Sequence, residues 1–249
     1  MIKKILGSKK TTAVLASICA VLIALNAGLG TLAYLTDEAT VVNTFTVGKV
    51  DIDLNETATD ENGNPITGDD GQPVDRVVEN KYHLIPGKSY VKDPTITVKA
   101  KSEEAYVRMM LTFTNASAVD AVVKNTKHGF DGDYAKWLQA WGWDPQEWNY
   151  VACKTDDVKN EITFEFRYKS TVKGADEDAK LKPLFERLVI PGTVTGEELA
   201  SLQDNPETTE VNEEMKIVVI GHAIQALGFE NADKAWEAFD GQMAPVEGQ

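Results

Sequence analysis

Apolar and polar residues alternate strictly along two stretches in the middle of the chain, and this pattern predicts strands. In Ala105–Thr114 one face carries only apolar side chains, namely Ala105, Val107, Met109, Leu111 and Phe113. In Glu161–Tyr168 the corresponding face carries Ile162, Phe164, Phe166 and Tyr168. A period of two residues is typical of a strand with one face buried. We predict a half-buried strand in each stretch.

Weaker patterns predict further strands on both sides of these two. Val50–Leu54 and Ile96–Ala100 alternate over a few residues, and Thr40–Val47 places most of its apolar residues on one face. Leu184–Ile190 is a further candidate. Met215–Ala226 is apolar on both faces, as expected of a central strand that is covered on both sides.

Three short helices are predicted from helical spacing and from capping residues. Asp133–Trp141 places four apolar side chains at i, i+3, i+4 and i+7, and Asp133 is a suitable N-cap. Thr195 and Glu198 have the spacing of a capping box ahead of a small surface helix. A closing helix carries Ala232, Ala235, Trp236 and Phe239 on one side.

These elements together predict one β-rich domain. The polar, turn-forming loop 55–75 and the Trp-rich insertion 130–150 interrupt the strands. Seven or more strands with helices only as insertions predict a mainly β fold, a jelly-roll-like β-sandwich with short helical insertions over 55–249. An N-terminal signal helix precedes it.

The first 33 residues have the order of a signal peptide. Four lysines come first, an apolar run extends over Ala13–Leu25, and small residues end at Ala33. We predict cleavage between Ala33 and Tyr34 by a signal peptidase, secretion of residues 34–249, and membrane contact only before the leader is removed. The alternative is a permanent membrane anchor over Thr11–Ala33.

The charge and the cysteine content of the mature chain limit which partners and which covalent crosslinks we expect. The whole chain has 25 Lys and Arg against 39 Asp and Glu, a formal net charge of −14. Loss of 1–33 removes four lysines and no acid, so 21 cations against 39 acids give −18. Such a chain repels phosphate backbones, so nucleic acid is not expected as a partner. Cys153 alone remains, which excludes an intrachain disulfide, and we predict that it is a small buried residue.

Sequence motifs for catalysis are missing. The histidines His83, His128 and His222 stand far apart and none begins an H-E-x-x-H motif, while His222 lies on an apolar strand as a core residue would. The run Asp60–Asn64 resembles a calcium loop but lacks the required glycine and glutamate, so solvated turns are the better interpretation. We expect no enzymatic activity, no metal site and no cofactor.

An aromatic cluster is the candidate binding surface. Its members are Trp137, Trp141, Trp143 and Trp148. Tryptophan faces stack on sugars or pack against a neighbouring subunit. The alternative is that these side chains only bury the insertion helix against the sandwich.

Four segments resemble the TasA/camelysin family of Gram-positive bacteria. They are GTLAYLTDEATVVNTFTVGKVDIDL at the leader junction, LIPGKSYVKDPTITV, the strand AYVRMML, and AIQALGFENADKAWEAF near the end. The resemblance implies export through a dedicated (SipW-type) signal peptidase. It also implies a secreted jelly-roll protein that forms or accompanies fibres of the extracellular biofilm matrix.

The resemblance also assigns roles to the N-terminal residues. Ala33 matches the last leader residue, Tyr34 the first mature residue, and 34–54 the strand region that one subunit can donate to the sheet of another. The implied partners are a second copy or a fibre-forming relative, joined by strand addition. A carbohydrate-binding module that uses the Trp cluster and a secreted metallopeptidase of the camelysin type are the alternative functions.

Overall fold

A computed structural model describes residues 36–40, 44–46, 50–202 and 215–243, and it describes the side chains from Val50 onward. The chain divides into two compact units, Met1–Leu35 and Thr36–Gln249, and all described residues belong to the second. The predicted leader therefore lies outside the described residues. So do parts of the predicted strand Thr40–Val47, of which Thr40 and residues 44–46 are described.

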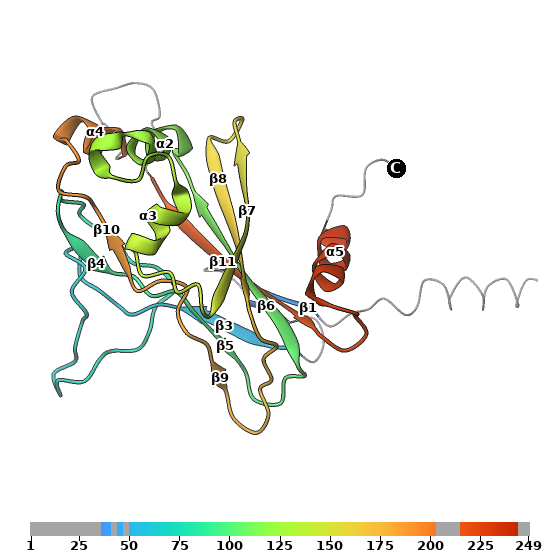
Figure 1. Cartoon of the computed structure of the whole chain (residues 1–249). Coiled ribbons are helices and arrows are strands. Elements are labelled where there is room, and N and C mark those ends of the chain that lie inside the picture. The colour runs from blue at the N-terminus through green and yellow to red at the C-terminus, as the bar shows by residue number, and fades with distance from the viewer. Residues whose placement is uncertain (1–35, 41–43, 47–49, 203–214, 244–249) are drawn as a thin grey trace, which may run out of the picture. The chain divides into compact units, whose positions relative to one another are not determined.

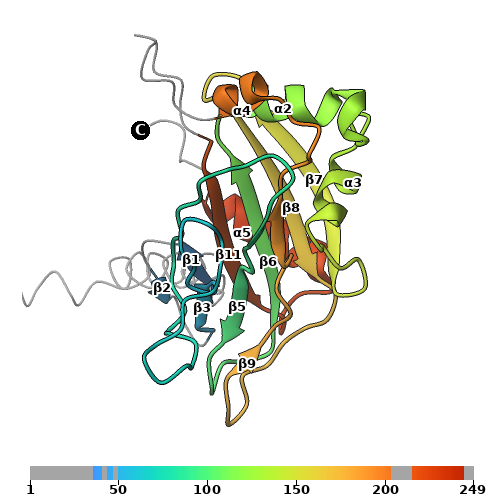
Figure 2. The ribbon, with the colours of Figure 1, turned by 90° about the vertical axis from the view of Figure 1, so that its left-hand side faces the viewer.

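A six-stranded antiparallel sheet is the larger layer of the fold (Figures 1 and 2). Its strand order is β2-β1-β11-β6-β8-β7, so the first and last of the described strands lie side by side in the sheet. The bounds are β1 Thr36–Thr40, β2 Thr44–Thr46, β6 Ala105–Phe113, β7 Trp148–Asp156, β8 Glu161–Tyr168 and β11 Ile217–Gln225.

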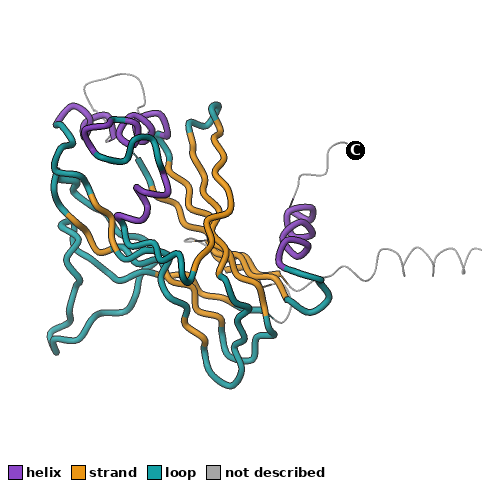
Figure 3. The backbone as a smooth tube through the Cα atoms, in the orientation of Figure 1, coloured by secondary structure: helices purple, strands orange, loops and turns teal. Residues whose placement is uncertain are grey.

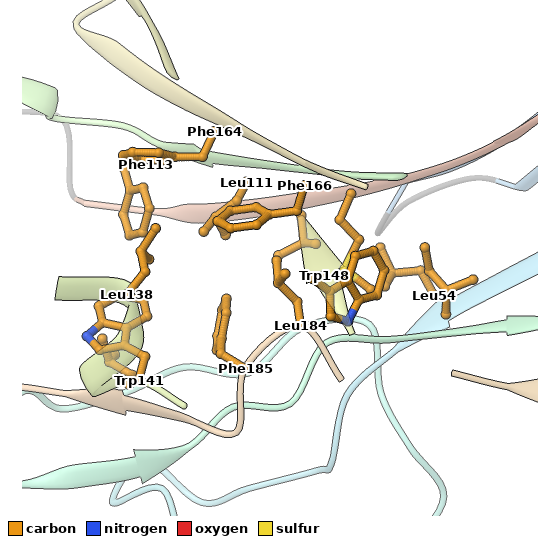
Figure 4. Close-up of a cluster of buried hydrophobic side chains, with 14 of the residues drawn as sticks. Leu54, Leu111, Phe113, Leu138, Trp141, Trp148, Phe164, Phe166, Leu184 and Phe185 are labelled. Carbon is orange, nitrogen blue, oxygen red and sulfur yellow. The ribbon is translucent and has the colours of Figure 1, made fainter. Parts of the chain in front are cut away.

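Two small sheets make up the second layer. One has the order β3-β5-β9, and the other pairs β10 with β4. The bounds are β3 Ile52–Asn55, β4 Ser89–Val91, β5 Thr95–Val98, β9 Ala179–Lys180 and β10 Arg187–Val189. The inward side chains of the two layers form one continuous core, in which Phe113 and Phe164 of the large sheet face Trp141, Phe185 and Leu184 (Figure 4).

Helices lie at one end of the sandwich and on the outer face of the large sheet (Figures 1 and 3). At the end are α2 Ala116–Lys124, the 3-10 turn η2 Thr126–His128, α3 Tyr134–Ala140 and α4 Gly196–Leu202. On the outer face is α5 Ala232–Met243, which buries Ala235, Trp236 and Phe239.

The strand and helix predictions agree with this structure in most places. β6 buries its predicted face, β8 buries its predicted face except for the half-buried Tyr168, and β11 lies between two other strands of the sheet. Asp133 caps α3 by accepting a hydrogen bond from the Lys136 amide at 3.1 Å. The capping box of α4 is also present, because Glu198 and Thr195 each accept a bond from the other's amide. The fold is mainly β with short helices.

The loop 55–75 is a series of tight turns rather than a featureless connection. Isolated bridges join Glu56 to Val77, Thr59 to Pro65, and Thr67 to Pro73. At the first turn Asp60 Oδ1 accepts bonds from the amides of Asn62 and Asn64, both at 2.9 Å. These bonds lower the pKa of Asp60, with the Asn64 amide as the main cause. The carboxylate oxygens are therefore used to close a turn, as predicted.

Candidate functional site

The position of β1 beside β11 is the candidate site. β1 runs antiparallel to β11, with Thr36 opposite Ile224 and Thr40 opposite Ile220. On its other side β1 pairs with the three-residue strand β2. The described N-terminal segment therefore fills a place in the sheet of its own subunit, and β2 forms the outer edge there.

The hydrogen-bond pattern shows which main-chain groups of β11 face β1. Ala226 donates to the Glu104 carbonyl at 2.8 Å, and Thr114 donates to the Lys216 carbonyl at 3.1 Å. Even-numbered residues of β11 therefore bond to β6. Because bonding alternates along an antiparallel strand, the odd-numbered ones face β1. Removal of β1 would leave the amides and carbonyls of Gly221 and Ala223 without a partner strand, which is the kind of edge that accepts an added strand.

Gly221 allows the two layers to approach closely at this place. A Cβ atom on Gly221 would lie 2.9 Å from Ile96 Cδ1 and 3.6 Å from Ile52 Cδ1. Both isoleucines are fully buried. The glycine therefore stands here because β3 and β5 leave no room for a side chain beneath β11.

Arg108 supports β11 from the outer face. Its Nε donates to His222 Nδ1 at 3.1 Å, and its two terminal nitrogens contact both carboxylate oxygens of Asp240 at 3.1 and 2.5 Å. The guanidinium also stacks against Trp236 and Phe239, at 4.5 and 5.0 Å from the ring centroids. Although Arg108 is at an outward position of β6, α5 buries it until only 4% is exposed.

Burial next to Arg108 also keeps His222 neutral. Desolvation, together with the positive charge of Arg108, lowers the pKa of His222 to about 3. Its Nδ1 accepts the Arg108 bond, which requires the unprotonated nitrogen there. The prediction that His222 is a satisfied core residue is confirmed. The role of Arg108 had no signal in the sequence, since an arginine at an outward strand position is ordinarily solvated.

The predicted aromatic binding surface is wrong for three of its four residues. Trp137, Trp141 and Trp148 are at most 5% exposed, and only Trp143 is half-buried. Trp137 and Trp141 pack against Phe113, with centroid distances of 5.1 and 5.7 Å. Figure 4 shows Trp141 and Trp148 pointing into the core. These side chains bury α3 and the start of β7 against the sandwich, so they offer no stacking platform for a sugar.

The prediction for Cys153 is also wrong, because the residue is exposed. It lies opposite Phe164 in the sheet, on the same face as that core residue, but β7 is the outermost strand. Partial burial still raises the pKa of the Cys153 thiol. At neutral pH the thiol is therefore protonated, which does not suit a nucleophile.

The histidines do not converge on one point. His128 is buried, with its ring nitrogens 2.8 Å from Thr193 Oγ1 and 3.1 Å from Glu198 Oε1, whereas His83 is exposed. Among the residues that the structure describes, no three His, Cys, Asp or Glu side chains lie together as metal ligands would.

A cavity of about 380 Å³ opens beside the start of β11. Leu84, Leu188 and Val219 form part of its wall. Lys92 and Glu56, also in its lining, form an ion pair of 2.7 Å, with side chains 7% and 6% exposed. This buried pair holds the segment between β4 and β5 against the chain that follows β3.

The predicted cleavage residues Ala33 and Tyr34 lie outside the described residues. Within the described parts of the chain, no helix has both the length and the apolar character that crossing a membrane requires. No known protein family, curated protein or solved structure matches the chain.

Proposed function

We propose that this protein is a secreted structural component of an extracellular matrix, a jelly-roll protein of the TasA/camelysin type. In this proposal, cleavage after Ala33 frees the N-terminal strand region 34–54. That strand then enters the sheet of a second copy or of a fibre-forming relative. The proposal treats the protein as non-enzymatic.

The observation that carries the proposal is the pairing of β1 with β11. A strand near the N-terminus of the mature chain lies with Asp37 opposite Ala223 and Ala39 opposite Gly221, the pairs that alternation makes hydrogen-bonded, and any identical strand can fill this place with the same bonds. Exchange between copies therefore keeps every main-chain bond. One strand passed head to tail from copy to copy is a heterologous contact, which builds an open filament when the rotation between copies does not close into a ring.

A complementation experiment tests this mechanism. The chain 48–249 lacks β1 and β2, so we expect lower thermal stability than for 34–249. A synthetic peptide 34–47 should bind it and restore the melting temperature. Electron microscopy of processed 34–249 should show filaments, and chains that lack 34–47 should show none.

Backbone N-methylation of the peptide supplies the matched control. The Ala39 amide faces β11, whereas the Glu38 amide faces β2, since the two bonding directions alternate along β1. N-methylation at Ala39 should abolish rescue, and the same change at Glu38 should be tolerated better. Equal binding of the two peptides, or a chain 34–249 that stays monomeric and takes up no peptide or relative, would refute strand exchange.

A further inference from the structure

Three polar side chains in the wall of the cavity beside β11 contact one another in sequence. They are Lys92, Glu56 and Asn80. Lys92 Nζ donates to Glu56 Oε2 at 2.7 Å, and Asn80 Nδ2 donates to the other oxygen, Glu56 Oε1, at 2.9 Å. One buried carboxylate therefore connects an amine with a side-chain amide.

The side-chain amide of Asn80 is fixed in one orientation. Its Oδ1 accepts a hydrogen bond from the Thr59 amide at 2.8 Å, and its Nδ2 also donates to the Thr57 carbonyl at 2.8 Å. A carbonyl oxygen cannot donate and a primary amide nitrogen does not accept, so the reversed orientation would lose these bonds. The carbonyl oxygen of Asn80 thus faces a main-chain N–H, and its nitrogen faces a carboxylate.

The backbone next to Glu56 is tied to the residue that follows Lys92. Thr57 donates to both carboxylate oxygens of Asp93, through its amide at 2.6 Å and its hydroxyl at 2.8 Å. Arg76 donates to Asp93 Oδ2 at 2.9 Å. The side chains of Lys92 and Glu56 are only 7% and 6% exposed. Amine, carboxylate and amide are therefore held in place together, which favours a reaction between neighbouring groups.

We propose that Lys92 and Asn80 react to form an amide crosslink within the chain, with Glu56 as the catalytic acid and base. The nucleophile is a lysine amine beside a carboxylate, and the electrophile is the side-chain carbonyl carbon of Asn80. The Thr59 amide stabilises the negative charge that develops on the carbonyl oxygen.

Atoms and charges balance in this step without an oxidant or a second substrate. Glu56 takes one proton from the Lys92 ammonium, and the neutral amine forms a bond to Asn80 Cγ. A second proton passes from Nζ to Nδ2, the Cγ–Nδ2 bond breaks, and ammonia leaves through the open cavity. Glu56 keeps the proton that it took. Uncharged groups thus replace a buried ion pair, and the cost of keeping two charges out of water is removed.

The crosslink closes a loop over residues 80–92, which contains β4. A closed loop restricts the unfolded chain, as a disulfide does, so the linked protein should unfold at a higher temperature. Cys153 is the only cysteine after the predicted leader, so no disulfide within the mature chain can have this effect. The inference does not depend on strand exchange at β1, because the reacting groups all lie within residues 56–92.

Mass spectrometry of the folded full chain tests the proposal. The protein should be lighter than its sequence by one ammonia molecule. After denaturation and digestion with trypsin, the peptide that carries Asn80 should be joined to Ser89–Lys99, because trypsin does not cleave after an acylated Lys92. Fragmentation should locate the bond between Asn80 and Lys92. Folded chains that yield the two peptides separately would overturn the proposal.

Substitutions test the part of each group. Glu56→Gln removes the proton acceptor, so the crosslink should form at least about a hundredfold more slowly. Glu79→Gln is the matched control and should keep the crosslink, because Glu79 lines the same cavity, is exposed and undergoes the same change of charge. Lys92→Arg keeps a cation beside Glu56 and should stay unlinked.

Two further results would contradict the proposal. One is equal crosslinking in the Glu56→Gln and Glu79→Gln chains. The other is an ammonia loss confined to Asn62, as cyclisation at the Asn62–Gly63 bond would produce. Circular dichroism shows whether each variant is folded, and the digest of the unaltered chain decides the question without any substitution. Filaments of unlinked chains would refute this inference and leave strand exchange at β1 intact.

Discussion

Gly221 gives the sharpest test of how closely the two layers of the sandwich pack. The change is Gly221→Ala, which adds one methyl group facing Ile96 Cδ1 at 2.9 Å and Ile96 Cγ1 at 3.2 Å. Because Ile96 is fully buried, it has little room to move. Overpacking of this kind costs about 1–3 kcal/mol. The loss of glycine's freedom in the unfolded chain returns about 0.4–1 kcal/mol, so a net loss of about 1.3 kcal/mol, within a range of about 0–2.6 kcal/mol, is expected.

Ile96→Val is the partner change, because it deletes the Cδ1 atom that meets the new methyl group. Alone it should cost about 0.5–1.5 kcal/mol. In the double variant, Gly221→Ala should add almost nothing to that cost. The two changes should therefore be non-additive by at least about 1 kcal/mol. Urea unfolding, followed by tryptophan fluorescence, gives the unfolding free energy of all four proteins. The values can be compared if the dependence of that free energy on urea concentration, the m-value, is the same in each. Additive losses would show that β5 does not lie beneath Gly221 as described.

Three further predictions concern the core and the helix caps. Lys92→Met should destabilise the protein by about 3 kcal/mol, because Glu56 stays buried without its cation; unfolding in urea measures this. Trp141→Ala should cost about 3–5 kcal/mol of unfolding free energy, since the indole is buried, and a chain that keeps full stability would contradict that position. The Thr195 amide bond, with further bonds from Asn125 and His128, lowers the pKa of Glu198 to about 2. The stabilising effect of the ionised Glu198 carboxylate should be complete above its ordinary pKa of 4.5 and should be lost as the pH falls toward 2. In the Glu198→Gln variant, the melting temperature should therefore change less with pH over that range.

The alternation of apolar and polar residues was enough to predict the strands that bury only one face. The alternation in β6 and β8 places Met109 and Phe166 correctly, because a period of two residues assigns each side chain to a face. The cap of α3 by Asp133 is also local, since it involves residues within one turn.

What lies above each face was not predictable, because it depends on contacts distant in the chain. Arg108 is at an outward position and is nevertheless buried, since α5 returns from the C-terminal end to cover it. Cys153, by contrast, is on the face that carries the buried Phe164 and is nevertheless exposed. The reason is that β7 is an edge strand, where the covering layer ends. The tryptophans of the insertion were ambiguous for the same reason, since an amphipathic face does not reveal whether it packs inward or against a partner.

The pairing of β1 with β11 affects the order in which contacts form while the chain is synthesised and folds. A chain that leaves the ribosome with its N-terminus first presents β1 long before residues 217–225 follow. Contacts between the two ends of a chain form late because a long loop must first close. During that interval β1 has no partner strand within its own molecule, so under the proposed strand exchange a folded second copy competes with self-closure for it. Under that proposal, the rate of synthesis and the local concentration of the protein help to decide which pairing forms.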